Sequence, residues 1–164
     1  MHLLLDVQFL ALLALANTAP LLAKRILGGR LAYPLDGGAT FLDGRPLFGA
    51  SKTIRGIVLA ILTTTAAALP IGLPAAAGAL VGASAMAGDL ISSFVKRRLA
   101  LPSSSKATGL DQVPESLLPL LACRGLLPLP LNILDMGLIV AVFFIGEIIF
   151  SCLFYRLGLR DRPY

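Results

Sequence analysis

Charged residues are scarce in this chain of 164 residues: Asp, Glu, Lys and Arg together make up 14% of it, against about 25% in an average soluble domain. Tryptophan is absent, and tyrosine occurs only three times. So little charge excludes an ordinary soluble domain, whose surface could not stay hydrated. The 57% of hydrophobic residues excludes a disordered chain. Together with a mean hydropathy of +0.86, these absences indicate an integral membrane protein with a thin aromatic belt at the membrane surface.

Apolar runs predict an all-α integral membrane protein of one domain, residues 1–164, with five transmembrane helices. Each span needs about 20 residues, so the chain is long enough for four or five. The predicted spans are Leu3–Ala23, Ile54–Leu69, Pro74–Val95, Val113–Leu127 and Ile133–Leu157. Pro114 and Pro119 lie within the fourth, so a segment that only partly crosses the membrane is the alternative there.

The basic residues set the expected orientation. With five spans, 13 of the 14 Lys and Arg residues fall on one side of the membrane and only Arg124 falls on the other. The positive-inside rule then places the N-terminus outside, and it places the C-terminus and two polar loops, 28–53 and 100–112, in the cytosol. The net charge of +5 is therefore interpreted as a topology signal rather than as a nucleic-acid surface. Cys123 and Cys152 fall near opposite faces of the membrane, which predicts two free thiols.

The first of these loops contains a hairpin pattern. Asp43-Gly44 separates the runs Thr40-Phe41-Leu42 and Arg45-Pro46-Leu47-Phe48, which predicts a β-hairpin with a two-residue turn. Asp36, Asp43 and the neighbouring glycines are accordingly interpreted as turn residues rather than ligands. The second loop has the composition of a flexible linker.

Asp89 is the sharpest chemical feature, because it lies in the apolar third span, about 12 Å along the helix from Arg97 at its basic end. A carboxylate at that depth is costly unless it faces water or a cation. Ser92, Ser93 and Lys96 follow at positions that share its helix face. This face combines hard oxygen ligands for Mg²⁺ with a cation for phosphate. A structural ion pair is the alternative.

Two further charged positions are expected at the same membrane face. Asp111 precedes the fourth span and can converge with Asp89, because spans three and four are antiparallel neighbours; its alternative role is a helix N-cap. Ser51-Lys52-Thr53 begins the second span, where free backbone N–H groups and the lysine form an anion site. Juxtamembrane anchoring is the alternative for Lys52.

Two other polar residues and a glycine pair complete the pattern. Asn17 and Glu147 lie at about the depth of Asp89, which predicts one water-filled pocket that opens to the cytosol, with a local ion pair as the alternative for Glu147. Gly78-x-x-x-Gly82 predicts close packing of the third span against another helix.

Two separated motifs carry a family resemblance. The first lies between Asn17 and Gly56 and ends in Asp-Gly-Arg-Pro-Leu-Phe-Gly-Ala-Ser-Lys-Thr-Ile-Arg-Gly. The second is Gly-Asp-Leu-Ile-Ser-Ser-Phe-Val-Lys-Arg from Gly88, followed by Leu-Asp-Gln at 110–112. Together they cover most of the chain in order, and they resemble the CDP-archaeol synthase family of membrane cytidylyltransferases. The small size fits this archaeal branch better than the longer phosphatidate cytidylyltransferases.

The resemblance implies a reaction and its participants. CMP is transferred from CTP to an ether-lipid phosphate, 2,3-di-O-geranylgeranylglyceryl phosphate, and pyrophosphate is released, with Mg²⁺ as the cofactor. The implied location is the cell membrane, crossed several times, with the active site facing the cytosol. A homodimer is compatible with this picture, and no nucleic acid takes part.

The resemblance also implies roles for individual residues. Asp89, Asp111 and Lys96 match the catalytic positions, and the two aspartates match the metal ligands. The positions that match contacts to CTP and its phosphates are Asn17, Lys52, Thr53, Arg55, Ser93, Lys96, Arg97 and Gln112. Pro20 and Gly56 match motif positions to which no duty is assigned. The lipid phosphate is already ionised, so no protein nucleophile is required.

Three other functions compete with this interpretation. A phosphatidate cytidylyltransferase would perform the same transfer on an ester lipid. A CDP-alcohol phosphotransferase needs several aspartates at helical spacing, and Asp89 has no acidic partner three or four residues later. A small transporter or channel would carry polar residues through the whole bilayer, whereas the outer half has only Asp6, Arg124 and Asp135 near its edge.

Overall fold

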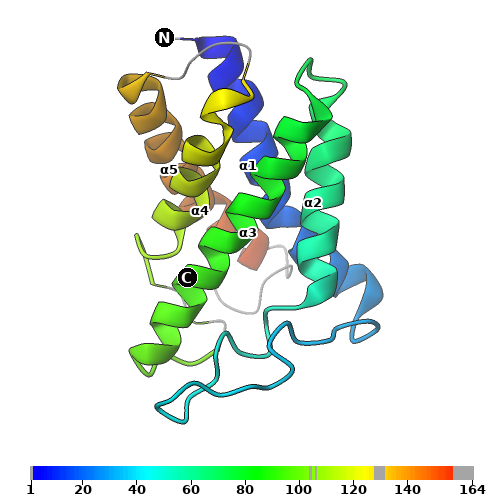
Figure 1. Ribbon diagram of the computed structural model, residues 1–164, viewed down its shortest axis with the longest axis vertical. Coiled ribbons are helices and arrows are strands. Elements are labelled where there is room, and N and C mark those ends of the chain that lie inside the picture. Colours follow the sequence, from blue (N-terminus) through cyan, green and yellow to red (C-terminus); the bar gives the residue numbers. More distant parts are fainter. Residues whose placement is uncertain (1, 104, 106, 128–131, 157–164) are drawn as a thin grey trace.

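The chain forms a helical bundle in a computed structural model, which describes residues 2–103, 105, 107–127 and 132–156 (Figure 1). The helices are α1 (Leu3–Leu27), α2 (Ile54–Ala68), α3 (Ala75–Arg98), α4 (Gln112–Ala122) and α5 (Ile133–Arg156), with a short 3₁₀ helix, η1 (Cys123–Gly125), after α4. The described ranges contain no strand, only two isolated β-bridges. The all-α class is therefore confirmed, and every predicted span coincides with a helix. Leu157, the predicted end of the fifth span, lies outside the described residues.

Successive helices run in opposite directions, so their connections fall at two ends of the bundle. The long loops after α1 and α3 lie together at one end, and the shorter connections after α2 and α4 lie at the other (Figure 1). This is the arrangement that the distribution of basic residues predicts. We call residues 28–53 the first loop and residues 99–111 the second loop.

The described helices differ in whether they can cross a membrane. Three are long and apolar enough to span one: α1, α3 and residues 133–153 of α5. With 15 and 11 residues, α2 and α4 extend about 22 Å and about 16 Å, which is less than a hydrocarbon core of about 30 Å. The bundle therefore contains three full-length candidate spans, and the count of five remains a prediction.

Small residues let the helices on either side of α3 approach it closely. A Cβ atom added at Gly78 would lie 2.4 Å from the backbone oxygen of Thr64 in α2, and one at Gly82 would lie 2.4 Å from the Thr64 Oγ1. The predicted close packing at this glycine pair is thus confirmed. On the other side, a Cβ at Gly88 would lie 2.4 Å from the backbone oxygen of Pro114 in α4. The contacts at Gly78 and Gly82 hold the second half of α2 against α3, and the contact at Gly88 brings the start of α4 against α3.

Pro20 and Gly56, the two motif positions without a predicted duty, meet where α1 crosses α2. A Cβ at Gly56 would lie 3.2 Å from the Cβ of Pro20, and Pro20 lies inside α1. Both residues therefore set how closely the two helices approach. Away from this crossing, α1 packs with α3, α4 and α5 in an apolar core. Its largest fully buried apolar side chains are Phe9, Leu12, Leu13, Val81, Leu120 and Ile139.

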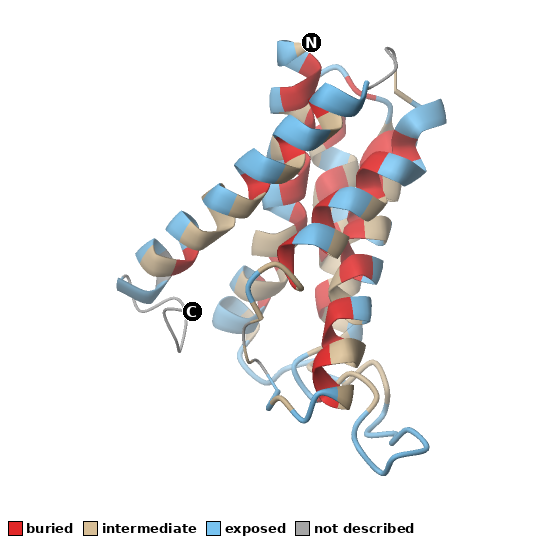
Figure 2. Cartoon of the chain, turned by 90° about the vertical axis from the view of Figure 1, so that its left-hand side faces the viewer, coloured by how far each residue is buried: buried red, intermediate tan, exposed pale blue. Residues whose placement is uncertain are grey.

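The α5 helix packs less tightly than the others. Only 17% of its most apolar window is buried, against 33% for α1 and 44% for α3. Figure 2 shows α5 leaning away from the bundle toward its C-terminal end. A pocket between α1 and α5 is lined by side chains of both helices. Cys123 is buried, Cys152 is partly exposed, and neither forms a disulfide, as predicted.

The predicted hairpin is present in the first loop, but its turn has three residues rather than two. Phe41 and Arg45 close the turn through Phe41 N–H donating to the Arg45 oxygen at 2.8 Å, and Thr40 bridges to Pro46. Gly44 has φ +73°, the left-handed conformation that ends a type I turn with a bulge. The Asp43 Oδ1 accepts from the Arg45 N–H at 3.1 Å, which favours this longer turn over the two-residue form.

The end of α3 is closed by an alanine in an unusual conformation. Ala100 has φ +59°, its N–H donates to the Arg97 oxygen at 3.1 Å, and the Leu101 N–H donates to the Lys96 oxygen at 3.0 Å. This is a Schellman cap, in which glycine is the usual residue. The cap turns the chain back, so that the second loop passes over the last turn of α3.

Replacement of Ala100 by glycine should therefore stabilise the protein. Removing the Cβ relieves the strain of a left-handed residue, and after the greater chain entropy of glycine is subtracted we expect a gain of about 0.5–1 kcal/mol in unfolding free energy. Thermal unfolding in detergent measures it. The matched control is Gly109→Ala, which places a Cβ at φ +88° with nothing within 4 Å and should lower the melting temperature. An Ala100→Gly protein no more stable than the parent would contradict this account.

Candidate active site

A lysine and an aspartate form the first element of the site. Thr53 caps α2, since its side chain accepts from the Gly56 N–H at 3.2 Å, and this cap places Lys52 at the mouth between α2 and α3. The Lys52 Nζ lies 2.6 Å from Oδ1 and 2.5 Å from Oδ2 of Asp89. The two side chains are 21% and 20% exposed. The cation that Asp89 was expected to need is therefore supplied by the first loop.

The charge on Lys52 is maintained by this partner. Burial by itself lowers the pKa of Lys52, but the charge and hydrogen bond of Asp89 outweigh it, and the resulting pKa lies above the ordinary lysine value. The carboxyl groups of Glu115 and Asp111 act in the same direction at longer range. Lys52 is thus a fixed positive charge that faces three acidic side chains.

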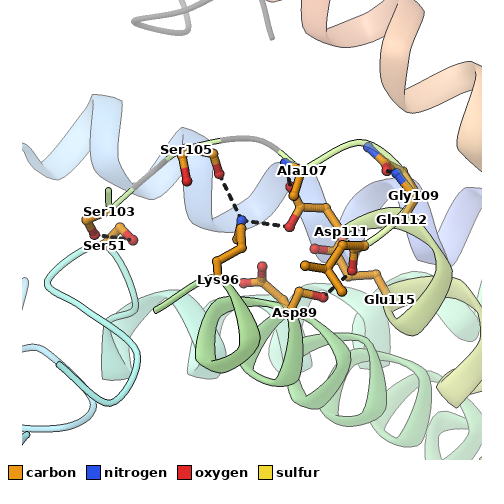
Figure 3. Close-up of polar contacts among 12 residues, drawn as sticks. Ser51, Asp89, Lys96, Ser103, Ser105, Ala107, Gly109, Asp111, Gln112 and Glu115 are labelled. Atoms are coloured by element: carbon orange, nitrogen blue, oxygen red, sulfur yellow. Dashed lines mark hydrogen bonds and ion pairs between the residues drawn. The ribbon is translucent and has the colours of Figure 1, made fainter. Parts of the chain in front are cut away.

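A second ion pair lies beside the first. The Lys96 Nζ lies 2.6 Å from Oδ1 of Asp111, and the two side chains are only 7% and 11% exposed. Figure 3 shows Lys96 between Asp111 and the backbone oxygen of Ser105, to which it donates at 2.9 Å. Lys96 pairs with Asp111 and also attracts Asp89 electrostatically. One lysine thus interacts with both aspartates, which supports their predicted convergence.

Asp111 does not act as a helix cap through its side chain. It occupies the N-cap position of α4, yet it makes no capping hydrogen bond to that helix. Its Oδ2 instead accepts from the Ala107 N–H at 3.0 Å, which turns the carboxylate toward the second loop. The capping alternative is therefore wrong, and both oxygens of Asp111 face the loop and Lys96.

Glu115 is a third acidic residue of the site, which the sequence analysis missed. It is 5% exposed, its Oε2 accepts from the Asn17 Nδ2 at 2.8 Å, and its carboxyl group is in hydrogen-bond contact with Asp89. The close approach of α4 to Gly88 brings it there. A glutamate in a first helical turn usually interacts with the helix dipole. Its position four residues after Asp111, on the same face, was the available signal.

Asn17 connects this cluster to an apolar cavity between α1 and α5. The cavity measures roughly 220 Å³. It is lined mainly by apolar side chains and also by Asn17 and Glu147, so two of the three residues of the predicted water-filled pocket line a pocket that is apolar instead. Asp89 is not among the lining residues, and the pocket reaches it only through the contacts of Asn17 with Glu115. The apolar lining includes Leu10, Ala14, Val142, Phe143, Gly146 and Phe150.

The remaining predicted residues surround the second loop or the end of α1. Arg97 is 5% exposed and donates to the Pro102 oxygen at 2.8 Å. Gln112 accepts from the Gly109 N–H at 2.7 Å, and Ser93 is buried in α3. Arg55 instead donates to the backbone oxygens of Gly28 and Arg30, and so ties α2 to the end of α1. The structure therefore brings the predicted lysines and aspartates into contact, whereas Arg55 binds backbone oxygens at the end of α1.

Known proteins share both the sequence pattern and this architecture. A family model described as CarS-like, CDP-archaeol synthase, matches residues 1–164. The chain belongs to the CDP-archaeol synthase family. The CDP-archaeol synthase of Thermococcus onnurineus is 32% identical over 163 residues, which cover 91% of this chain and 89% of that protein. That of Sulfurisphaera tokodaii is 31% identical over 136 residues, or 80% of this chain and 81% of the relative.

A solved structure agrees with the family assignment. It is that of an intramembrane enzyme for archaeal membrane lipid biosynthesis, and it matches with a TM-score of 0.71 and 27% sequence identity over 85% of this chain and 90% of its own. As a member of the CDP-archaeol synthase family, the chain is a membrane enzyme. The family resemblance of the two motifs is therefore confirmed.

Asp89→Asn should abolish turnover in this family member. The substitution removes the carboxylate charge at the centre of the site, but it also leaves Lys52 without its charged partner, which costs stability when the lysine stays buried. Activity and thermal unfolding should be measured together. The double variant Lys52→Met/Asp89→Asn removes the unpaired charge, and we expect it to recover stability while remaining inactive. An active Asp89→Asn enzyme would make Asp89 a structural residue only.

Proposed function

We propose that this chain transfers CMP from CTP to 2,3-di-O-geranylgeranylglyceryl phosphate, an unsaturated archaeal ether lipid, and so forms CDP-archaeol. An oxygen of the lipid phosphate bonds to the α-phosphorus of CTP, and the bond from that phosphorus to pyrophosphate breaks. The observation that carries the proposal is the pair of ion pairs, Lys52–Asp89 and Lys96–Asp111, gathered at one end of the bundle. Family membership supports the choice of reaction.

The chain needs no nucleophile of its own for this reaction, because the attacking oxygen belongs to an ionised phosphate. What remains is to position two anions against each other and to neutralise their charge, as in phosphoryl transfer generally. Lys52 and Lys96 are suited to the triphosphate, and the buried Arg97 adds a third cation beside them. Their present partners are carboxylates, which the phosphates would replace.

The acidic residues fit Mg²⁺ by donor type. Among the described residues, no group of three or more His, Cys, Asp or Glu side chains is arranged to hold a metal by itself. Mg²⁺ is commonly held by one or two carboxylates together with substrate phosphates, so Asp89 and Asp111 are sufficient. We assign these two residues as its ligands. When bound there, the ion would neutralise charge on the phosphates.

The cavity between α1 and α5 supplies a place for the lipid. Its walls are apolar, and its polar residue Asn17 contacts the acidic cluster through Glu115. A lipid chain that occupies this cavity would bring its phosphate to the level of Asn17. CTP would enter from the loop-bearing end, which we place in the cytosol of a five-span protein of the cell membrane. The two substrates would then meet at the boundary between the loops and the bundle.

The direct test is incubation of the purified protein with radiolabelled CTP, Mg²⁺ and either an ether-linked or an ester-linked lipid phosphate in mixed micelles. We expect label in a lipid product and release of pyrophosphate with the ether lipid. Label incorporated faster into the ester lipid would favour a phosphatidate cytidylyltransferase. If neither lipid acquires label with wild-type protein, the proposed reaction is wrong.

Replacing either Lys52 or Lys96 by alanine should weaken CTP binding. Each substitution removes one charge-assisted contact, which corresponds to roughly 10- to 150-fold in affinity. Isothermal titration of CTP with Mg²⁺ measures the change. The matched control is Arg124→Ala, at the other end of the bundle, which should bind CTP as the parent does. If both lysine variants keep the parental affinity, neither lysine contacts the nucleotide.

Filling the cavity should impair the use of lipid but not of CTP. Gly146 lines the cavity, and a Cβ there would meet nothing within 4 Å, so Gly146→Phe can project into the space without a backbone clash. We expect the KM for the lipid phosphate to rise while the KM for CTP stays constant. The matched control is Val58→Phe, because Val58 in α2 is 46% exposed and does not line the cavity. An unchanged lipid KM for Gly146→Phe would exclude this cavity as the lipid site.

A further inference from the structure

The first loop is a folded unit that carries Lys52. The Asp36 Oδ2 accepts from the N–H groups of Phe48 and Gly49, both at 3.0 Å, which joins the two halves of the loop. Burial raises the pKa of Asp36, but hydrogen bonds from Phe48, Gly38 and Gly49 reverse the effect and hold it below the ordinary value. The carboxylate is thus a stable acceptor at the centre of the loop.

Lys52 is fixed within this unit through its backbone. The Leu35 N–H donates to the Lys52 oxygen at 2.8 Å, and the Ile54 N–H donates to the Tyr33 oxygen at 3.1 Å. Pro34 and Thr53 form a β-bridge between these two hydrogen bonds. A displacement of the loop would therefore move Lys52 relative to Asp89, which belongs to α3.

Arg98, in the last turn of α3, holds the hairpin of this loop. Its guanidinium carbon lies 4.9 Å from the ring centre of Phe41 in the hairpin and 4.8 Å from that of Phe94 in α3. The two rings meet edge to face at 5.2 Å. A cation packed against aromatic rings is favourable when it is partly removed from water, and the Arg98 side chain, which contacts both rings, is 20% exposed. One side chain therefore joins α3 to the hairpin.

The same guanidinium also forms an ion pair and two backbone hydrogen bonds with the hairpin. Its Nη1 lies 3.2 Å from Oδ1 of Asp43, and its Nη2 donates to the backbone oxygens of Pro46 at 2.7 Å and Arg45 at 3.3 Å. The Arg45 Nη1 donates in return to the Arg98 oxygen at 2.5 Å. The Asp43-Gly44 turn is therefore shaped around Arg98, which accounts for a motif that the proposed chemistry leaves unused.

We propose that Arg98 is a positioning residue: it fixes the first loop on the end of α3, and through the loop it holds Lys52 opposite Asp89. The expected effect of Arg98 on the KM for CTP rests on the proposed function, whereas its expected effect on the position of the loop does not. Lysine cannot replace it, because an ammonium group lacks both the planar face and the fork of donors that these contacts use.

The first test separates positioning from general stabilisation. Arg98→Ala and Arg98→Lys should both raise the KM for CTP by at least about 10-fold, the loss expected for one misplaced charge-assisted contact, and should leave the KM for the lipid unchanged. Phe41→Leu, a milder change in the hairpin, should shift the same KM in the same direction by less. The control is Arg30→Ala, an exposed arginine of the same loop, which should behave as the parent. A parental CTP KM in both Arg98 variants would overturn the proposal.

The second test reports the position of the loop and needs no substrate. The Ser51 Oγ in the first loop lies 3.3 Å from the Ser103 Oγ in the second loop, so cysteines at both positions should cross-link under mild oxidation in a protein whose native cysteines are replaced by alanine. We expect Arg98→Ala to slow this cross-linking several-fold and Arg30→Ala to leave it unchanged.

Together the two tests distinguish a failure of the positioning role of Arg98 from a failure of the proposed reaction. Slower cross-linking with inactive wild-type protein would support loop fixation and reject the reaction. A raised CTP KM with cross-linking at the parental rate would mean that Arg98 contacts the nucleotide itself, which would overturn the positioning role.

Discussion

The interaction on which the rest of the site depends is the pair between Lys52 and Asp89. An aspartate inside an apolar helix is costly unless a cation or water neutralises it, and α3 carries no basic residue within one turn of Asp89. The cation must therefore come from another segment, and the first loop supplies it. This requirement explains why the loop is a folded unit anchored at Asp36 and at Arg98 rather than a flexible linker.

Buried ion pairs of this kind contribute little to the stability of a protein, because the cost of removing two charges from water often exceeds their attraction. The two ion pairs, and Glu115, which contacts both Asp89 and Asn17, are better explained by a role in binding substrates. They hold charged groups in place until substrates with more negative charge arrive. The apolar cavity is lined by Asn17, which contacts Glu115 of this cluster, so in the proposed reaction an insoluble and a soluble substrate would approach the same residues from different sides.

Glycines and a proline set the geometry that makes this convergence possible. Gly88 lets α4 approach α3 until Glu115 reaches Asp89, and Gly56 lets α2 approach α1 at Pro20. A side chain at Gly88 would push α4 outward and separate the acidic residues. The helix contacts and the chemistry therefore depend on the same few small residues.

The sequence by itself determined the helices, the separation of the long loops from the short connections, and four of the charged residues that meet, Lys52, Asp89, Lys96 and Asp111, because hydropathy and spacing act locally along the chain. It also identified the Gly78 and Gly82 contact from residue size. Only the tertiary structure decided that Lys52 pairs with Asp89 and Lys96 with Asp111, that Asp111 turns away from its helix, and that Glu115 enters the site. It likewise decided that Arg55 binds the end of α1 and that Arg98 holds the hairpin. These outcomes depend on the distance between helices and on the fold of a loop, and contacts between residues so far apart in the chain leave no periodic signal in it.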